Sequence, residues 1–324
     1  MREGAKKGMK TGMFVFLCIV IFIVTFVASI LFKISYTSPE MKKYSVQWSD
    51  EIGTIHTDLI YGDKPANKFD LYLPEDDGKE SYGLVVYLHA GGFRTGDKAD
   101  DAKILQWLCS KGYAAAGINY TLNNGENPDA NIYTMSMEIK ESIPHVIEEA
   151  KKLGYNIDRM AMAGGSAGGC LASIYAYRDA ADAPVSVKML FQGVGPTSFY
   201  PKDWKSYGLD KDSEAAATFF SFMCGKEITA DMFGIAAYDE LMKDVSALLC
   251  VDEDSCPTVM AYGQHDIFQP YEASVRLDKA LTENGVPHEY IVLPHSGHGL
   301  QNDDKCYVRY MEKVEEYLDT YMIK

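Results

Sequence analysis

The segment MAMAGGSAGGCLA, Met160 to Ala172, restricts the possible folds more than any other part of the sequence. An apolar, strand-like run ends at Ala163, the pattern Gly-x-Ser-x-Gly follows at residues 164–168, and a helix-like stretch begins at once. A sharp turn between a strand and a helix lifts a serine clear of the sheet, and glycines beside it avoid collisions with neighbouring backbone. The pattern lacks the Gly-Lys-Ser/Thr of a phosphate loop and the spacing of a dinucleotide-binding loop. It therefore predicts a nucleophile, Ser166, at a helix N-terminus, where developing negative charge is favoured.

The chain beyond residue 50 alternates strand-like and helix-like stretches. Apolar runs predict strands that are buried on both faces, and the stretches of helical period between them predict covering helices. This pattern favours an α/β fold with a mostly parallel sheet flanked by helices on both sides. The predicted strands are 69–74, 83–90, 113–120, 159–165, 187–195, 258–264 and 289–295, and the predicted helices cover 101–112, 137–154, 169–180 and 271–285.

Two segments downstream of Ser166 carry candidates for a general base and its orienting acid. A serine hydroxyl is a weak nucleophile until a base takes its proton, and that base needs an acid to orient it. Asp266 follows one late strand and His298 follows the next, in a glycine-rich loop, so both lie at the carboxyl ends of strands. We expect Ser166, Asp266 and His298 to form a catalytic triad. The alternatives are less well placed and look structural, exposed or loop-bound: His56, His145, His265, His288, His295, Asp252, Asp254, Asp303 and Asp304.

A second glycine-rich loop follows the strand that ends near His89. Its sequence HAGGF lets the backbone approach a reacting carbonyl closely and offer N–H groups to the negative oxygen. We expect Gly91, Gly92 and the N–H group of Ala167 to form this oxyanion hole. His89 is expected to hydrogen-bond the backbone of the turn.

Five motifs, LHAGGFRTGDK, INYTL, GGSAGG, GQHD and HSGHG, occur in this order and at sensible spacing. Together they resemble the α/β-hydrolase esterases of the hormone-sensitive-lipase-like and acetyl or feruloyl esterase type, from about Phe69 to the C-terminus. Two positions depart from the family pattern. Ala90 stands where the family has the first glycine of His-Gly-Gly-Gly, and Thr121 stands where an arginine commonly follows the strand-end tyrosine, here Tyr120.

The segment from about 196 to 246 is too long for a simple connection between two core strands. It combines many charges with large apolar side chains, which fits a helical cap insertion over the site. We expect most of these side chains to pack the cap onto the core, although such a cap would also line the substrate pocket. They are Trp204, Phe219, Phe220, Phe222, Met223 and Met232.

The N-terminus predicts a membrane anchor. Residues 13–32 carry no charge and reach the roughly 20 residues that a helix needs to cross a bilayer. A cleaved signal peptide is the alternative, but its apolar core is typically shorter, about 7–15 residues. Four basic residues precede the span, which favours a cytoplasmic N-terminus (1–12), a stalk (33–50) and an extracytoplasmic catalytic domain (51–324) in a bacterial envelope.

Charge and cysteine content exclude some functions. The formal net charge of −15 makes nucleic acid a poor partner. The seven cysteines include Cys18 in the apolar span, and the other six leave disulfides possible, although isolated thiols are favoured. No cysteine or histidine spacing predicts a metal site, and no cofactor is expected.

The resemblance implies a serine carboxylic-ester hydrolase acting on short-chain acyl esters, acetyl esters first, of small molecules or polysaccharides. One alternative is a serine peptidase of the prolyl-oligopeptidase type, which shares the fold but usually carries a large N-terminal propeller. The other is a catalytically silent binding module on the same fold.

Overall fold

The computed structural model describes residues 2–35 and 41–323, with side chains given for 13–29 in the first range. The chain divides into two compact units, residues 1–43 and 44–324. The first unit contains the helix α1 (Arg2–Ser35). In the part of the chain that the structure describes, no helix combines the length and apolar character needed to cross a membrane. The predicted anchor over residues 13–32 is therefore not supported, and residues 36–40 of the predicted stalk lie outside the described residues.

The second unit is built on an eight-stranded sheet with the order β1-β2-β4-β3-β5-β6-β7-β8. The first two pairings in this order are antiparallel and all the others are parallel, as the two-sided apolar runs predict. The strands are β1 (Gly53–Ile60), β2 (Lys68–Pro74), β3 (Tyr82–Leu88), β4 (Ala114–Ile118), β5 (Ile157–Gly165), β6 (Ser186–Gly193), β7 (Thr258–Gly263) and β8 (His288–Leu293).

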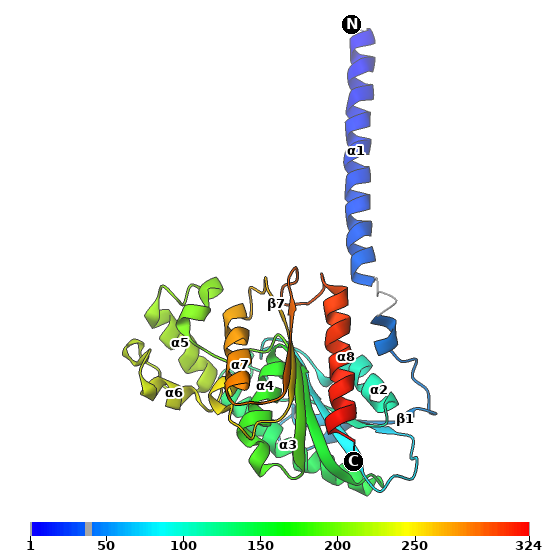
Figure 1. Ribbon diagram of the computed structural model, residues 1–324. Helices are drawn as coiled ribbons and strands as arrows, with labels where there is room; N and C mark the ends of the chain where they lie inside the picture. Colours follow the sequence, from blue (N-terminus) through cyan, green and yellow to red (C-terminus); the bar gives the residue numbers. More distant parts are fainter. Residues whose placement is uncertain (1, 36–40, 324) are drawn as a thin grey trace. The chain divides into compact units, whose positions relative to one another are not determined.

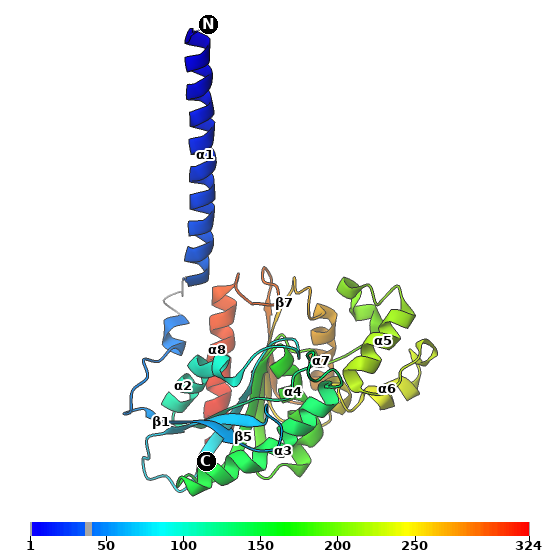
Figure 2. The ribbon, with the colours of Figure 1, turned by 180° about the vertical axis from the view of Figure 1, so that it is seen from behind.

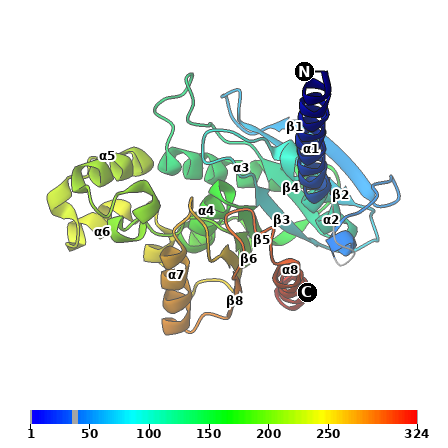
Figure 3. The ribbon, with the colours of Figure 1, turned by 90° about the horizontal axis from the view of Figure 1, so that it is seen from above.

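Helices cover both faces of this sheet (Figure 1). Helices α2 (Ala102–Ser110) and α8 (Asp304–Tyr321) lie on one face. Helices α3 (Ile132–Lys152), α4 (Ala167–Ile174) and α7 (Tyr271–Glu283) lie on the other, as the view from above shows (Figure 3). Each helix buries an apolar face against strands that are themselves buried, which confirms the predicted α/β class.

Strand β1 and helix α8 were not among the predicted elements. β1 lies at the edge of the sheet, most of its residues are exposed or half-buried, and its polar sequence GTIHTDLI lacks a continuous apolar run. Its register shifts between His56 and Leu59, and Asp58 between them has a φ of 57°. Such bulges are common on edge strands and hide the two-residue period that identifies a strand in a sequence.

The insertion between β6 and β7 is largely helical, with α5 (Ser213–Cys224) and α6 (Ala236–Met242) as its main elements. From behind, both helices project beyond the side of the sheet that carries α3 and α7 (Figure 2). We call residues 196–246 the cap. Its interior is a group of packed rings, the cap aromatic cluster, made of Phe199, Trp204, Phe219, Phe220, Phe233 and Tyr238.

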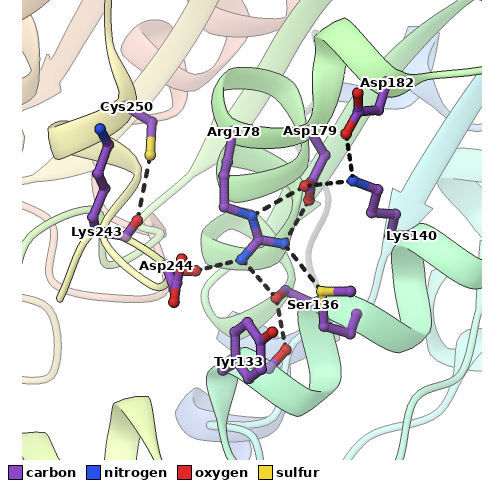
Figure 4. Close-up of polar contacts among 10 residues, drawn as sticks. Tyr133, Ser136, Lys140, Arg178, Asp179, Asp182, Lys243, Asp244 and Cys250 are labelled. Atoms are coloured by element: carbon purple, nitrogen blue, oxygen red, sulfur yellow. Dashed lines mark hydrogen bonds and ion pairs between the residues drawn. The ribbon is translucent and has the colours of Figure 1, made fainter. Parts of the chain in front are cut away.

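An arginine whose side chain is 13% exposed joins the cap to the core (Figure 4). Helix α4 continues into a π-helical turn (Tyr175–Asp179), where Arg178 donates to the backbone carbonyl of Asp244 at the end of the cap. The same guanidinium donates to Ser136 Oγ on α3 (3.0 Å) and pairs with the buried carboxylate of Asp179, which also accepts from Lys140 (3.3 Å). Because its charge is balanced and its donors reach three segments, Arg178 fixes where the cap returns to the sheet.

Candidate active site

The nucleophile turn has the predicted geometry. β5 ends at Gly165, α4 begins at Ala167, and Ser166 between them has a φ of 52° and a ψ of −120°. A Cβ atom at Gly168 would lie 1.8 Å from the Leu88 carbonyl oxygen, and one at Gly164 would lie 2.5 Å from the Gly168 backbone. Both glycines are therefore required by close packing. The Ser166 N–H group donates to the Gly193 carbonyl (2.8 Å), which fixes the turn against β6.

Three side chains that are distant in sequence meet beside this turn. His298 Nε2 lies 2.8 Å from Ser166 Oγ, and His298 Nδ1 lies 2.7 Å from Asp266 Oδ2. Asp266 follows β7 and His298 follows β8, so the carboxyl ends of β5, β7 and β8 carry one residue each. We call the loops after β3, β5, β7 and β8 the active-site edge. The structure brings together all three residues of the predicted triad.

The carboxylate of Asp266 is held by its own loop. Its side chain is only 1% exposed, and Oδ1 accepts the backbone N–H groups of Phe268 (2.8 Å) and Gln269 (2.9 Å). Oδ2 is left to face the imidazole of His298, whose ring meets Phe268 edge-on at 5.4 Å. A buried carboxylate in this position favours the tautomer with a proton on Nδ1, which leaves Nε2 free to accept from Ser166.

The predicted oxyanion residues lie in a tight turn after β3. Gly91 and Gly92 have φ values of 123° and 59°, and Phe93 follows at 65°. The Gly91 carbonyl accepts the N–H groups of Arg94 (3.1 Å) and Thr95 (3.0 Å), and a Cβ atom at Gly91 would lie 1.9 Å from the Thr95 oxygen. Ala167, the first residue of α4, has an N–H group that no acceptor inside the helix can reach.

His89 holds the backbone of this turn through a hydrogen bond. Its ring is buried and stacks on Tyr120 with centroids 4.4 Å apart, and its Nδ1 lies 2.7 Å from the Ala90 carbonyl. Burial lowers the pKa of His89, so the neutral ring donates through Nδ1 to that carbonyl. The Tyr120 hydroxyl donates to the His89 carbonyl (2.8 Å). Ala90 itself is exposed, so its methyl group is accommodated where the family has glycine.

Ser166 and His298 open onto a pocket of about 540 Å³ between the active-site edge and the cap. Of the large apolar side chains that the sequence assigns to the cap, four line this pocket: Trp204, Phe219, Phe222 and Met223. Phe220 is fully buried in the cap aromatic cluster instead. The remaining lining residues with large or polar side chains were not singled out from the sequence: Phe93, Arg94, Asn123, Asn131, Ile132, Tyr207, Phe268 and Gln269.

The positions of some of these residues in the sequence could have identified them as neighbours of the site. Arg94 follows the oxyanion glycines directly, and Phe268 and Gln269 follow Asp266, so proximity along the chain places them near the site. Asn123 and Asn131 come from the loop between β4 and α3 and carry no such signal.

The hydroxyl of Tyr207, another residue that lines the pocket, has a raised pKa because the ring is partly buried and lies near the negative charge of Asp266.

His295 and Asp303, two of the alternative candidates, form a separate pair. His295 Nδ1 lies 2.8 Å from Asp303 Oδ1, and the His295 side chain is 78% exposed. Ser296 also donates to Asp303 (2.6 Å), so this carboxylate closes the loop before α8 rather than facing Ser166. Among the residues that the structure describes, no group of three or more metal-binding side chains is present, and the cysteines are free thiols.

Comparisons with known proteins relate this chain to esterases. The chain is 24% identical to esterase LipC of Mycobacterium tuberculosis over 253 residues, which is 74% of this chain but only 59% of LipC. It is 23% identical to ethyl acetate hydrolase of Pseudomonas putida over 257 residues, 76% of each protein. Its fold matches a solved structure of a truncated carbohydrate esterase from gut microbiota with a TM-score of 0.66 and 18% identity, covering 84% of this chain and 98% of that one.

The likeness in fold and the order of the motifs place the sheet, the nucleophile turn and the cap in the α/β-hydrolase fold, which confirms the predicted resemblance to esterases of that fold. The comparison with protein families gives a match over residues 69–281, from β2 to α7. This chain therefore belongs to the BD-FAE family of α/β-hydrolases.

Proposed function

We propose that this chain is a serine carboxylic-ester hydrolase that uses Ser166, His298 and Asp266. The observation that carries the proposal is the continuous hydrogen-bonded chain from Ser166 Oγ through the imidazole to a buried carboxylate, at the base of a pocket. Family membership and the esterases among the relatives support the reaction type.

In the first half of the reaction, Ser166 Oγ attacks the ester carbonyl carbon while His298 Nε2 takes the hydroxyl proton. The carbonyl oxygen becomes negatively charged and accepts the N–H groups of Gly91 or Gly92 and of Ala167. His298 then gives its proton to the leaving alcohol oxygen, and an acyl group remains on Ser166. In the second half, water loses a proton to His298 Nε2 and attacks the acyl carbon. His298 then returns this proton to Ser166 Oγ as the bond between Oγ and the acyl carbon breaks, and the acyl group leaves as the acid.

Asp266 acts on this cycle without touching the substrate. When His298 holds the extra proton, the imidazolium lies beside a carboxylate that is removed from water, and the two opposite charges stabilise each other. The two backbone N–H groups on Oδ1 hold that carboxylate in a fixed direction.

Short acyl groups, with acetyl as the first candidate, form the finer part of the proposal. The relative named ethyl acetate hydrolase supports an acetyl preference. A series of p-nitrophenyl esters from acetate to octanoate tests it, and kcat/KM is expected to fall as the chain lengthens. An optimum at octanoate would contradict the acetyl preference while leaving the reaction type intact. The extracytoplasmic location of the catalytic domain stays a prediction from the sequence.

The reaction type is tested with the full chain and the variant Ser166→Ala. We expect hydrolysis of p-nitrophenyl acetate and butyrate to fall by at least about 10⁴-fold, because the nucleophile is lost and the rest of a triad cannot replace it. Ser173→Ala, which removes a hydroxyl from the same helix, is the matched control. A fluorophosphonate probe should label the wild type and the control but not Ser166→Ala. Full activity in Ser166→Ala would refute the proposal, and a wild type that is neither labelled nor active would favour a silent binding module.

A further inference from the structure

The pocket above Ser166 has two chemically different walls. The cap contributes a wall of aromatic and thioether side chains, among them Trp204, Phe219 and Phe222. The loops after β3 and β4 contribute polar groups, namely Arg94, Asn123 and Asn131. A ligand that fills the pocket therefore meets apolar surface on one side and hydrogen-bond donors on the other.

Among the described residues that line this pocket, Arg94 is the one whose side chain is always charged. Among the described residues that line it there is no aspartate, glutamate or lysine beside Arg94. This composition is unusual for a chain with 46 acidic residues and a net charge of −15. The guanidinium of Arg94 therefore places a positive charge at the pocket wall, and this favours an anionic group on the ligand.

Arg94 also differs from the three arginines of the second unit that form ion pairs. Arg159, Arg178 and Arg276 each pair with an aspartate, Asp158, Asp179 and Asp203 respectively. Arg94 is exposed and has no ion pair with any described carboxylate. Its guanidinium thus keeps all its donors for a ligand.

The two acids nearest to Arg94 in the sequence are engaged elsewhere. Asp97 accepts the backbone N–H of Ala99 (2.9 Å) and the side-chain amide of Asn119 (2.7 Å). Asp100 Oδ2 accepts the Asp97 N–H group (3.0 Å), which completes a capping box at the start of the next helical turn. This box ties both carboxylates to the backbone, where neither pairs with Arg94.

The backbone at Arg94 is as firmly fixed as the oxyanion turn itself. The Arg94 N–H group donates to the Gly91 carbonyl (3.1 Å), and the carbonyl of the preceding Phe93 accepts the Asn123 N–H group (2.8 Å). Arg94 therefore stands two residues beyond Gly92, on the loop expected to hold the reacting carbonyl oxygen. Because Arg94 and Ser166 line the same pocket, one ligand that fills the pocket contacts both residues.

We propose that Arg94 selects substrates that carry a carboxylate in addition to the scissile ester, with the apolar part of the substrate against the cap wall. The planar guanidinium matches a carboxylate with two parallel hydrogen bonds. The proposal rests on the proposed ester hydrolysis, and it names the substrate class for that site: apolar or aromatic esters that also bear a carboxylate.

Two acetate esters that differ only in charge test this selection. The anionic one is 4-acetoxybenzoate and the neutral one is 4-acetoxybenzamide, which has nearly the same shape. We expect the full wild-type chain to prefer the anion by about tenfold in kcat/KM, mainly through KM, since a charge-assisted hydrogen bond supplies an effect of this order. Arg94→Gln should bring the ratio of the two kcat/KM values close to one, and Arg94→Lys should restore part of it.

Arg309→Gln is the matched control, because Arg309 is an exposed arginine on α8 outside the pocket and its loss changes the net charge equally. It should leave the ratio at the wild-type value. An unchanged ratio in Arg94→Gln, or a wild type that prefers the neutral ester, would overturn the selection by Arg94.

A binding measurement separates this inference from the proposed reaction. The amide 4-acetamidobenzoate is not expected to be hydrolysed readily, and its affinity for the wild type, followed by calorimetry, should fall about tenfold in Arg94→Gln. If neither ester is hydrolysed but this loss of affinity is found, the proposed function fails and the carboxylate site stands. If both esters are hydrolysed and the affinity does not change, the carboxylate site fails and the function stands.

Discussion

The active-site edge and the cap line the same pocket, yet different forces hold their side chains. At the edge, hydrogen bonds and forced backbone angles fix Ser166, His298 and Asp266 one by one. In the cap, ring packing holds the aromatic cluster, and its centroid distances lie between 5.1 and 6.3 Å. Hydrogen bonds are directional and set positions closely, whereas apolar contact responds mainly to volume and area.

Because of this difference, we expect the two regions to affect different measurable quantities. Proton transfer between Ser166 and His298 needs atoms within hydrogen-bond distance, so small displacements at the edge should reduce kcat. The cap wall only has to exclude water and match the bulk of the substrate, so changes there should act on KM or on stability. Three variants test whether this separation holds.

The largest effect is expected at the edge. Asp266→Asn keeps the size of the side chain but allows the other imidazole tautomer, in which Nε2 carries the proton and cannot accept from Ser166. We expect kcat to fall by about 10³ to 10⁴-fold with little change in KM, measured with p-nitrophenyl acetate. Asp303→Asn alters the other aspartate–histidine pair and should leave kcat within about twofold of the wild type. Equal losses in both variants would mean that Asp266 acts only through folding.

A pair of neighbouring phenylalanines tests the cap. Phe220 is fully buried and contacts five other rings, whereas Phe222 is 44% exposed and lines the pocket. Phe220→Ala leaves a cavity and should lower the free energy of unfolding by about 3 to 5 kcal/mol. Phe222→Ala should lower it by less than about 1 kcal/mol and raise KM for butyrate esters several-fold. Urea unfolding measures the free energies and steady-state kinetics measure KM. A larger loss of stability in Phe222→Ala than in Phe220→Ala, with the larger rise in KM in Phe220→Ala, would contradict the position of the cap wall in the structure.

The smallest effect concerns a carboxylate of the core that lacks the partners of Asp266. Asp101, just before α2, has a buried oxygen with no hydrogen-bond partner in the described structure. Burial, with a smaller contribution from Asp100, raises the pKa of Asp101 from its ordinary 3.8 to about 7. The folded chain thus holds a proton that the unfolded chain loses, so this group makes stability fall as pH rises from about 4 to about 7, after which the loss is constant.

Asp101→Asn removes this ionisation. We expect the variant to be more stable than the wild type by about 1 to 3 kcal/mol at pH 8, with the gain shrinking towards pH 4, in urea titrations at several pH values. Asp210→Asn, at an exposed position of the cap, should show no such pH dependence. A gain that is the same at pH 4 and pH 8 would place its origin in packing rather than in charge.

Much of the site was predictable because its chemistry follows the strands. Apolar runs identify buried strands, and in a parallel sheet the residues that follow their carboxyl ends gather at one edge, which is why Asp266 could be chosen over Asp303. His295 follows the same strand as His298, and the glycines beside His298, Gly297 and Gly299, distinguished the two. Strand β1 could not be found in this way, since an edge strand with a bulge has one exposed face and a broken period.

The sequence by itself determined the α/β class, the nucleophile turn at Ser166 and the order of the three residues that meet there. These depend on local patterns: apolar period, glycine where Cβ atoms would collide, and polar residues directly after strands. Only the tertiary structure decided that Phe222 faces the pocket while Phe220 is buried, that Arg178 joins the cap to α4, and that Arg94 lines the pocket without a carboxylate partner. Contacts between segments far apart in the chain depend on how whole elements pack, and no local pattern records that packing.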